Sequence, residues 1–192
     1  MKVREVMTSD VSFCSRTATL TDAAIIMWQR DCGAVPVVDE RNRIAGIITD
    51  RDICIAVATK NRLPSQISVS EITNQKVETC APQDEAEEAL KKMKKHQLRR
   101  LPVVSRENVL LGILSISDLL RHAGRGSNAV SRKKIFAALK EITSFRPLQL
   151  REISVEAIAP TNEIEAFDDP PFAESREVET ENSEKEIDER SN

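Results

Sequence analysis

The stretch Gly46-Ile47-Ile48-Thr49-Asp50-Arg51-Asp52 returns 66 residues later as Gly112-Ile113-Leu114-Ser115-Ile116-Ser117-Asp118. At the same offset, Pro36-Val37-Val38 returns as Pro102-Val103-Val104. The chain therefore contains one structural unit twice. Two repeats are too few for an open solenoid, which needs about three units to bury its faces. We therefore expect a closed pair around a pseudo-two-fold axis.

Each repeat is expected to run strand, helix, strand, strand, helix. Apolar spacing and turn residues place the first repeat's elements at 11–14, 21–30, 35–38 and 44–48, with a last helix from about 50. The second repeat's elements are expected at 77–80, 85–95, 101–104, 109–114 and 116–122. This mixture predicts an α+β fold of two β-α-β-β-α repeats packed as a pseudo-two-fold pair, over 1–62 and 63–124.

The last third of the chain lies outside both repeats. Apolar spacing predicts a further helix within 128–145 that carries Arg132, Lys133 and Lys134 on its outer side. Residues 151–192 hold 4 basic and 14 acidic residues, a net charge of −10, whereas 1–150 has a net charge of +7. A segment so acidic and so poor in apolar residues cannot bury enough surface to fold, so 160–192 is predicted to be a disordered tail.

The composition also indicates the cellular compartment in which the protein is expected. The N-terminus carries charges where a signal peptide needs an apolar core, and the apolar runs are too short to cross a bilayer, so we expect a cytoplasmic protein with no membrane contact. The four cysteines lack the CxxC or Cys/His spacing of a zinc site and are interpreted as thiols in a reducing compartment. Cys14 and Cys80 are equivalent in the repeats, which leaves a redox bridge between them as the alternative.

The duplicated strand-to-helix junction has two interpretations. Thr49 with Asp52, and Ser115 with Asp118, fit a capping box, in which hydroxyl and carboxylate satisfy backbone N–H groups. The same geometry suits a nucleotide: free N–H groups and the helix dipole attract phosphate, and the Asp can accept from ribose hydroxyls. A mid-strand glycine would let a base approach closely. The presence of two symmetric copies favours the ligand interpretation.

These motifs resemble the cystathionine β-synthase (CBS) domain family over about residues 1–123, including Leu101-Pro102-Val103-Val104 after Arg99-Arg100. The resemblance implies that adenine nucleotides bind in clefts between the repeats. Asp52 and Asp118 would hold ribose hydroxyls, and Thr49 and Ser115 would contact phosphate or ribose. The residues expected to bind ligand are Ser9, Val11, Ala34, Pro36, Thr49, Arg51, Asp52, Gln75, Val77, Leu98, Arg99, Arg100, Pro102, Ser115, Ser117 and Asp118.

The two clefts are expected to differ. Residues before the proline line the phosphate side in the family, and here they are Gly33 and Ala34 in one repeat but Arg99 and Arg100 in the other. A guanidinium pairs bidentately with phosphate, so the second cleft should be the tighter phosphate site. Arg51 can partly compensate in the first. The alternative is that Arg99 and Arg100 are a solvated cap at a basic helix end.

No sequence pattern supports catalysis, because the chain contains no P-loop, dinucleotide fingerprint or HExxH motif. We expect a regulatory module, not an enzyme, that senses AMP, ADP or ATP and signals through a change in shape or assembly. The resemblance implies a homodimer, and the C-terminal region is a candidate contact for a protein partner. Two alternatives stay open: a nucleic-acid-associated regulatory protein, suggested by the basic body, and an interaction module with empty clefts. We also expect Asp118→Ala to weaken nucleotide binding while leaving the fold intact.

Overall fold

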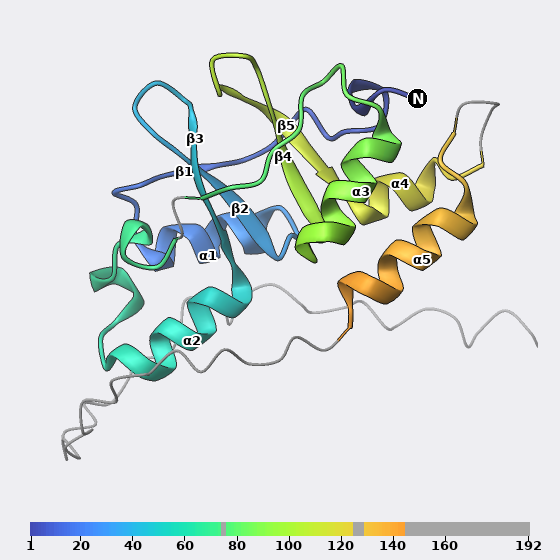
Figure 1. Ribbon diagram of the computed structural model, residues 1–192. Coiled ribbons are helices and arrows are strands. Elements are labelled where there is room, and N and C mark those ends of the chain that lie inside the picture. Colours follow the sequence, from blue (N-terminus) through green and yellow to red (C-terminus); the bar gives the residue numbers. More distant parts are fainter. Residues whose placement is uncertain (74–75, 125–128, 145–192) are drawn as a thin grey trace, which may run out of the picture. The chain divides into compact units, whose positions relative to one another are not determined.

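The computed structural model describes residues 1–73, 76–124 and 129–144, and Figure 1 shows their arrangement. The first repeat contains β1 (Cys14–Ser15), α1 (Leu20–Gln29), β2 (Ala34–Val38), β3 (Ile44–Thr49) and α2 (Asp50–Lys60). The second contains α3 (Ala86–His96), β4 (Arg100–Val104), β5 (Leu110–Ser115) and α4 (Ile116–Arg121). The remaining elements are η1 (Val3–Glu5), η2 (Pro64–Gln66), η3 (Val69–Glu71) and α5 (Arg132–Ile142). The predicted α+β pair of repeats is confirmed.

The two hairpins have the same register. β2 and β3 pair antiparallel with Val37 opposite Gly46, and β4 and β5 pair antiparallel with Val103 opposite Gly112. Both hairpins are irregular at the next residue of the first strand. The repeated sequence therefore reproduces the pairing of each strand as well as the order of the elements.

The predicted first strand of each repeat is largely wrong. Within 11–14 only Cys14 enters β1, which pairs parallel with β2, and within 77–80 only Cys80 forms an isolated parallel bridge, to Val103. The residues before Cys14 are used elsewhere, since Ser12 Oγ accepts from Arg30 Nε at 2.8 Å. Side-chain contacts to the end of α1 thus replace the expected ladder.

The leading segment of the chain packs into the second repeat. Val3 and Val6 are buried in one core cluster with the inner residues of α3, β4 and β5. The Val3 N–H donates to the Asp84 carbonyl at 3.0 Å, and the Ala86 N–H donates to the Met1 carbonyl at 2.9 Å. The start of the chain therefore completes the core of the repeat that lies farther along the sequence.

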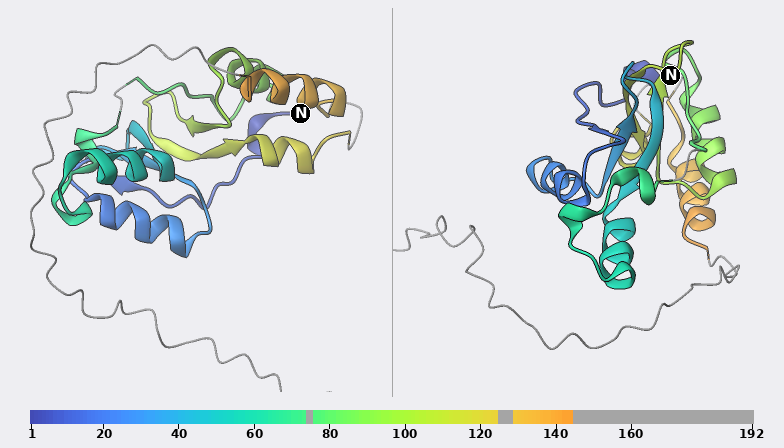
Figure 2. Two further views of the ribbon diagram at one scale, coloured as in Figure 1. Left: turned by 90° about the horizontal axis from the view of Figure 1, so that it is seen from below. Right: turned by 90° about the vertical axis from the view of Figure 1, so that its left-hand side faces the viewer.

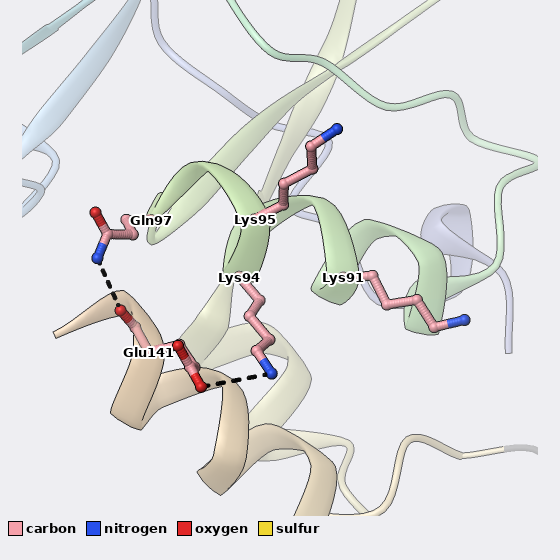
Figure 3. A pocket seen from close by; sticks show the side chains of 5 residues that line it. All are labelled: Lys91, Lys94, Lys95, Gln97 and Glu141. Carbon is pink, nitrogen blue, oxygen red and sulfur yellow. Dashed lines mark hydrogen bonds and ion pairs between the residues drawn. The ribbon is translucent and has the colours of Figure 1, made fainter. Parts of the chain in front are cut away.

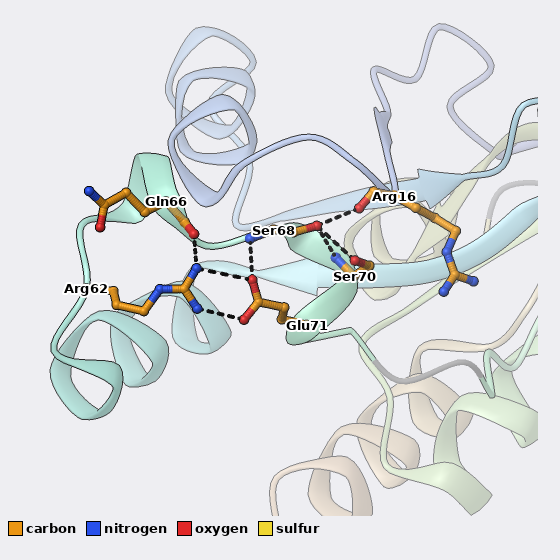
Figure 4. Close-up of polar contacts among 6 residues, drawn as sticks. All are labelled: Arg16, Arg62, Gln66, Ser68, Ser70 and Glu71. Atoms are coloured by element: carbon orange, nitrogen blue, oxygen red, sulfur yellow. Dashed lines mark hydrogen bonds and ion pairs between the residues drawn. The ribbon is translucent and has the colours of Figure 1, made fainter. Parts of the chain in front are cut away.

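The segment that connects the two repeats precedes the second repeat but packs into the core of the first. Ile67 and Val69 are fully buried with the inner residues of α1, β2 and β3. Figure 4 shows the polar contacts that fasten this segment: Arg62 Nη1 lies 2.9 Å from Glu71 Oε2, and the Ser68 hydroxyl donates to the Arg16 carbonyl at 3.0 Å. The two repeats therefore exchange their leading segments.

The motif glycines lie where these exchanged segments cross the hairpins. A Cβ added at Gly112 would lie 2.5 Å from the carbonyl oxygen of Thr8, and one at Gly46 would lie 3.0 Å from Cβ of Thr73. Thr8 also exchanges two backbone hydrogen bonds of 2.9 Å with Ile113. The missing side chains make room for the protein's own chain, so the space expected for a base is already filled at both glycines.

The tips of the two hairpins also join the repeats. Asn42 and Asn108 both adopt positive φ, at 57° and 66°, a conformation that asparagine tolerates well. The Ile44 N–H donates to the Asn108 carbonyl at 2.9 Å, and the Leu110 N–H donates to the Asn42 carbonyl at 3.0 Å. These two reciprocal hydrogen bonds are related to each other by the pseudo-two-fold symmetry that the repeat predicts.

The additional helix packs on the second repeat alone. α5 lies beside α3, as Figures 1 and 2 show, and also contacts α4. Its inner residues Ile135, Ala138 and Ile142 are buried in the second core. Ser131 sets its start, since its hydroxyl accepts from the Lys134 N–H at 3.2 Å. The predicted helix thus exists, within narrower bounds than 128–145, while the predicted tail of 160–192 lies outside the described residues.

The C-terminal end of α5 is tied to the end of α3. Gln97 Nε2 donates to the Glu141 carbonyl at 3.1 Å, and Lys94 Nζ lies 3.7 Å from Glu141 Oε1 (Figure 3). Lys91, Lys94 and Lys95 surround a surface hollow of about 370 Å³ at this junction. Lys94 and Lys95 lie in the last turn of α3, where the helix dipole favours cations.

The two equivalent cysteines lie in separate cores. Cys14 belongs to the first core cluster and Cys80 to the second, and both are free thiols. Burial raises the pKa of the Cys14 thiol to about 11 and that of the Cys80 thiol to about 12. Both are therefore protonated near neutral pH, and the alternative of a bridge between them is not realised.

We expect Ile135→Ala to lower the free energy of unfolding by about 2–5 kcal/mol, because Ile135 is fully buried between α5 and the second core. Phe136→Ala is the matched control: it is adjacent on the same helix but 73% exposed, and its loss should change stability by less than about 0.5 kcal/mol. Urea unfolding measures both. Equal effects would mean that α5 does not pack on α3.

We also expect Gly112→Ala to destabilise the fold by about 1–3 kcal/mol, the usual cost of overpacking. Gly46→Ala should cost less than Gly112→Ala, because its added Cβ meets a threonine side chain instead of a backbone carbonyl. Thermal unfolding of the two variants side by side measures the difference. The reverse order would contradict the close crossing at Thr8.

Candidate functional site

The first strand-to-helix junction is a complete capping box. The Asp52 N–H donates to Thr49 Oγ1 at 3.2 Å. In return, Asp52 Oδ2 accepts from the Thr49 N–H at 3.0 Å and from the Thr49 hydroxyl at 2.6 Å. The local sequence thus explains why β3 stops and α2 starts at this point. One oxygen of Asp52 is committed to the helix start.

The second junction repeats this arrangement. The Asp118 N–H donates to Ser115 Oγ at 3.2 Å, and Asp118 Oδ2 accepts from the Ser115 N–H at 2.7 Å and from its hydroxyl at 2.6 Å. The capping-box interpretation is therefore correct for both copies. Ligand binding, if it uses these carboxylates, must use their second oxygens.

The expectation of free N–H groups is wrong at the first junction. Besides the bonds between Thr49 and Asp52, the Asp50 N–H donates to the Gly33 carbonyl at 3.3 Å and the Arg51 N–H donates to Asp50 Oδ1 at 2.7 Å. All four donors are satisfied by the protein's own oxygens. A phosphate here would be attracted by the helix dipole and by side chains and not by unpaired backbone groups.

The second carboxylate oxygens distinguish the two repeats. Asp118 Oδ1 accepts a hydrogen bond from Arg121 Nη2, and Asp118 is only 3% exposed. The residue equivalent to Arg121 in the first repeat is Ile55, and Asp52 Oδ1 accepts no hydrogen bond from the described residues. Asp52 therefore presents an open acceptor, whereas Asp118 is closed by an arginine.

The strand register places the residue two positions before each proline next to the junction. Ala34 lies opposite Thr49, and Arg100 lies opposite Ser115. Directly opposite residues of an antiparallel pair project to the same face, so Arg100 and Ser115 share one face of the second hairpin. Arg99 is exposed, and its carbonyl accepts from the Ile116 N–H at 2.9 Å. The residue opposite the cap thus differs between the repeats, alanine in the first and arginine in the second, while the role of Arg99 and Arg100 in binding phosphate stays a prediction.

The leading segments bring residues of one repeat to the other. Because Thr8 pairs with Ile113, Ser9 lies next to Gly112, on the hairpin that carries Arg100 and Ser115. Ser9 therefore lies against the hairpin of the second repeat, although it precedes the first repeat's strands in sequence. The periodicity of the sequence contains no signal for this exchange of segments. It also does not identify Thr8 and Thr73, the two residues that approach the motif glycines.

The other predicted residues occupy varied positions. Pro36 and Pro102 are buried in their strands, opposite Ile47 and Ile113. Arg51 and Ser117 are exposed in the first turns of their helices. Val11, Val77 and Leu98 are half-buried, and Gln75 lies outside the described residues. The structure thus gathers Arg100, Ser115 and Asp118 at one end of the second hairpin, and Ala34, Thr49 and Asp52 at one end of the first, whereas Ser9 lies beside Gly112 in the middle of β5.

The chain belongs to the CBS domain family, whose family model matches residues 3–59 and 69–125. It is 35% identical to the CBS domain-containing protein YhcV of Bacillus subtilis over 73% of this chain and 94% of that protein. The fold is similar to Hypoxic Response Protein I, solved with two coordinated zinc ions, with a TM-score of 0.59 and 32% identity over 64% of this chain and 98% of that one.

A second solved structure bears on the ligand. The CBS domain pair of protein MJ0100, solved in complex with 5′-methylthioadenosine and S-adenosyl-L-methionine, has a TM-score of 0.58 and 25% identity over 63% of this chain and 94% of that one. Both of its ligands contain adenosine, the chemistry expected from the motif residues of the present chain. Relatives within this fold therefore include a domain pair that binds adenosine compounds.

Within 1–73, 76–124 and 129–144 no group of three or more His, Cys, Asp or Glu side chains is arranged to hold a metal ion. In the same ranges, no helix has both the length and the apolar character needed to cross a bilayer.

The structure changes the expected outcome of Asp118→Ala. Asp118 is buried and accepts from the Ser115 N–H, the Ser115 hydroxyl and Arg121, so its removal should lower the free energy of unfolding by about 2–4 kcal/mol. Ser117→Ala, an exposed substitution on the same helix, is the control and should be nearly neutral. Chemical unfolding measures both variants. A fully stable Asp118→Ala protein would show that the capping box contributes little.

Proposed function

We propose that this protein is a regulatory, non-catalytic module that binds adenosine-containing nucleotides in clefts between its two CBS repeats. The observation that carries the proposal is the duplicated junction, which places a carboxylate at the start of a helix in each repeat. The adenosine ligands named for the similar pair of protein MJ0100 support the same ligand class. Occupancy of the clefts would be signalled by a change in conformation or assembly.

The first cleft is suited to the nucleoside part of a ligand. Asp52 Oδ1 is open, and a carboxylate oxygen accepts strongly from ribose hydroxyls. The residue facing Thr49 is Ala34, which offers no charge to a phosphate. Arg51, exposed in the first turn of α2, supplies the nearest cation in the motif.

The second cleft is suited to a phosphate, and it contains an arginine that can change its partner when a ligand binds. Arg100 faces Ser115, and Arg121 holds the oxygen of Asp118 that a ribose would need. The Arg121 side chain is 67% exposed but that of Asp118 is only 4% exposed, so Arg121 leaves without a large cost only where another donor, such as a ribose hydroxyl, replaces it on the carboxylate. A nucleotide whose phosphate attracts Arg121 and whose ribose replaces it on Asp118 would shift the protein between two states by differential affinity.

We also propose that the protein forms a homodimer, as the family resemblance implies, and that the C-terminal region contacts a further protein. A ligand that binds at a repeat interface can alter assembly only if the assembled and free states differ in affinity for it. The ligand and the assembly state are therefore to be measured independently.

Calorimetric titration with AMP, ADP, ATP, S-adenosylmethionine and adenosine tests the ligand class. We expect saturable binding, with Arg100→Ala reducing AMP affinity at one class of site by about 10–100-fold, the loss of one charge-assisted hydrogen-bonded pair, while adenosine binding is unchanged. Arg106→Ala, which removes an exposed arginine from the hairpin turn, is the control.

Three outcomes of these titrations would each contradict part of the proposal. If no nucleotide binds, the module has empty clefts or another ligand. Salt-dependent binding of a nucleic acid in place of nucleotides would favour the nucleic-acid alternative, which the three lysines of α3 in Figure 3 would then serve. Equal loss of AMP and adenosine affinity in Arg100→Ala would mean that this arginine supports the fold of the cleft and does not pair with phosphate.

A further inference from the structure

The four cysteines of the chain fall into two classes. Cys14 and Cys80 are buried, each in one of the two cores. Cys54 is exposed and Cys32 is half-buried, and both are free thiols. A thiol reacts only where its thiolate can form and a reagent can reach it, so reactivity is expected at Cys32 and Cys54 and not in the cores.

Only the first repeat has thiols at these two accessible positions. In the second repeat the residues equivalent to Cys32 and Cys54 are Leu98 and Leu120. Leu98 is half-buried and Leu120 is 46% exposed, so the fold accepts apolar side chains at both positions. The shared fold therefore does not require cysteine at either position, and the two thiols give the first repeat a chemistry that the second lacks.

The two accessible thiols line one surface hollow of the first repeat, with a volume of about 530 Å³. Cys32 follows α1, and its neighbour Gly33 contacts the first turn of α2, since the Asp50 N–H donates to the Gly33 carbonyl at 3.3 Å. Cys54 lies four residues beyond Asp50, on the same side of α2, and Asp50 also lines the hollow. Two thiols from segments that are separate in the sequence therefore border the same space.

We propose that Cys32 and Cys54 form a redox-sensitive site, in which an oxidant of the low-molecular-weight disulfide class joins them in a reversible bridge. The thiolate of the exposed Cys54 attacks one sulfur of the oxidant, which forms a mixed disulfide and releases one thiolate. The thiolate of Cys32 then attacks the Cys54 sulfur and releases the second. Each leaving thiolate takes up the proton that the attacking cysteine lost. Two protein thiols are thus oxidised to one disulfide, and one disulfide oxidant is reduced to two thiols.

The bridge closes around the first strand-to-helix junction. Cys32 lies two residues before Ala34, which pairs with Thr49, and Cys54 lies two residues after Asp52. A bridge therefore fixes the segment before β2 to the first turns of α2. Disulfides in a reducing compartment are usually transient and redox-sensing, as such a site requires. An effect of the bridge on a ligand at this junction rests on the proposed function, whereas the formation of the bridge does not.

The bridge is tested by equilibrating the full chain in buffers of graded ratios of reduced to oxidised glutathione, followed by acid quenching, alkylation and tryptic mass spectrometry. We expect a cross-link between the peptides 31–41 and 52–60 within a single copy of the chain, and its loss on reduction. The bridged chain should unfold at a temperature higher by about 5 °C, because the bridge restricts the unfolded chain. Cys54→Ser removes an exposed thiol and should abolish both signals. Cys14→Ala is the control and should retain the cross-link.

The unmodified chain also gives the results that would overturn the proposal, so the test does not depend on how well a variant folds. The absence of a cross-link between these two peptides at every glutathione ratio would overturn it. A bridge that joins two copies of the chain would do the same, as would a glutathione adduct that persists on Cys54. A cross-link that includes the peptides 5–16 or 77–91, which contain Cys14 and Cys80, would show that the buried thiols react instead.

Adenosine tests whether the bridge acts on the first cleft. Because coupling between two sites is reciprocal, saturating adenosine should change the glutathione ratio at which half of the chain is bridged by at least about fivefold. An unchanged ratio, in a chain that calorimetry shows to bind adenosine, would mean that the bridge does not regulate the cleft. A chain that binds no adenosine would contradict the proposed function, and the cross-link between Cys32 and Cys54 would still establish the redox site.

Discussion

The exchange of leading segments between the repeats is the constraint on which the rest of the structure depends. Val3 and Val6 complete the second core, and Ile67 and Val69 complete the first. Neither repeat can bury its core with its own contiguous sequence. The crossings require Gly112 and Gly46, because a side chain at either would meet the incoming segment. The same crossing places Ser9 beside Gly112 on the second hairpin.

The capping boxes show how one group serves structure and ligand chemistry together. In each box, a single carboxylate oxygen satisfies the backbone and the hydroxyl of the cap, which leaves the other oxygen for a different partner. In the first repeat that oxygen is open, and in the second it is held by Arg121. Equivalent motifs therefore differ in whether the second carboxylate oxygen is open to a ligand. The difference is caused by Arg121, which lies three residues beyond the second motif.

The second repeat is also the one that α5 covers. Its helices carry lysines at the positions where the first repeat has Ile25 and Trp28, and Lys94 is paired with Glu141 of α5. The duplicated unit has thus diverged into a covered half and an exposed half. A symmetric pair would have two equivalent helix surfaces, whereas here α5 covers the helices of the second repeat alone.

The sequence alone determined the repeat, the α+β class and the positions of most helices and strands, because these follow from local chemistry. The capping pair Ser115 and Asp118 fixes where a helix starts, and the apolar run around Pro102 indicates a buried strand. The same local patterns also identified the candidate carboxylates. They could not establish the exchange of Val3 and Ile67, since both repeats offer similar apolar partners and periodicity does not say which copy is filled. They likewise could not distinguish an open Asp52 from a closed Asp118 or seat α5 on one repeat. These features depend on distances between segments far apart in the chain, and only the tertiary structure sets them.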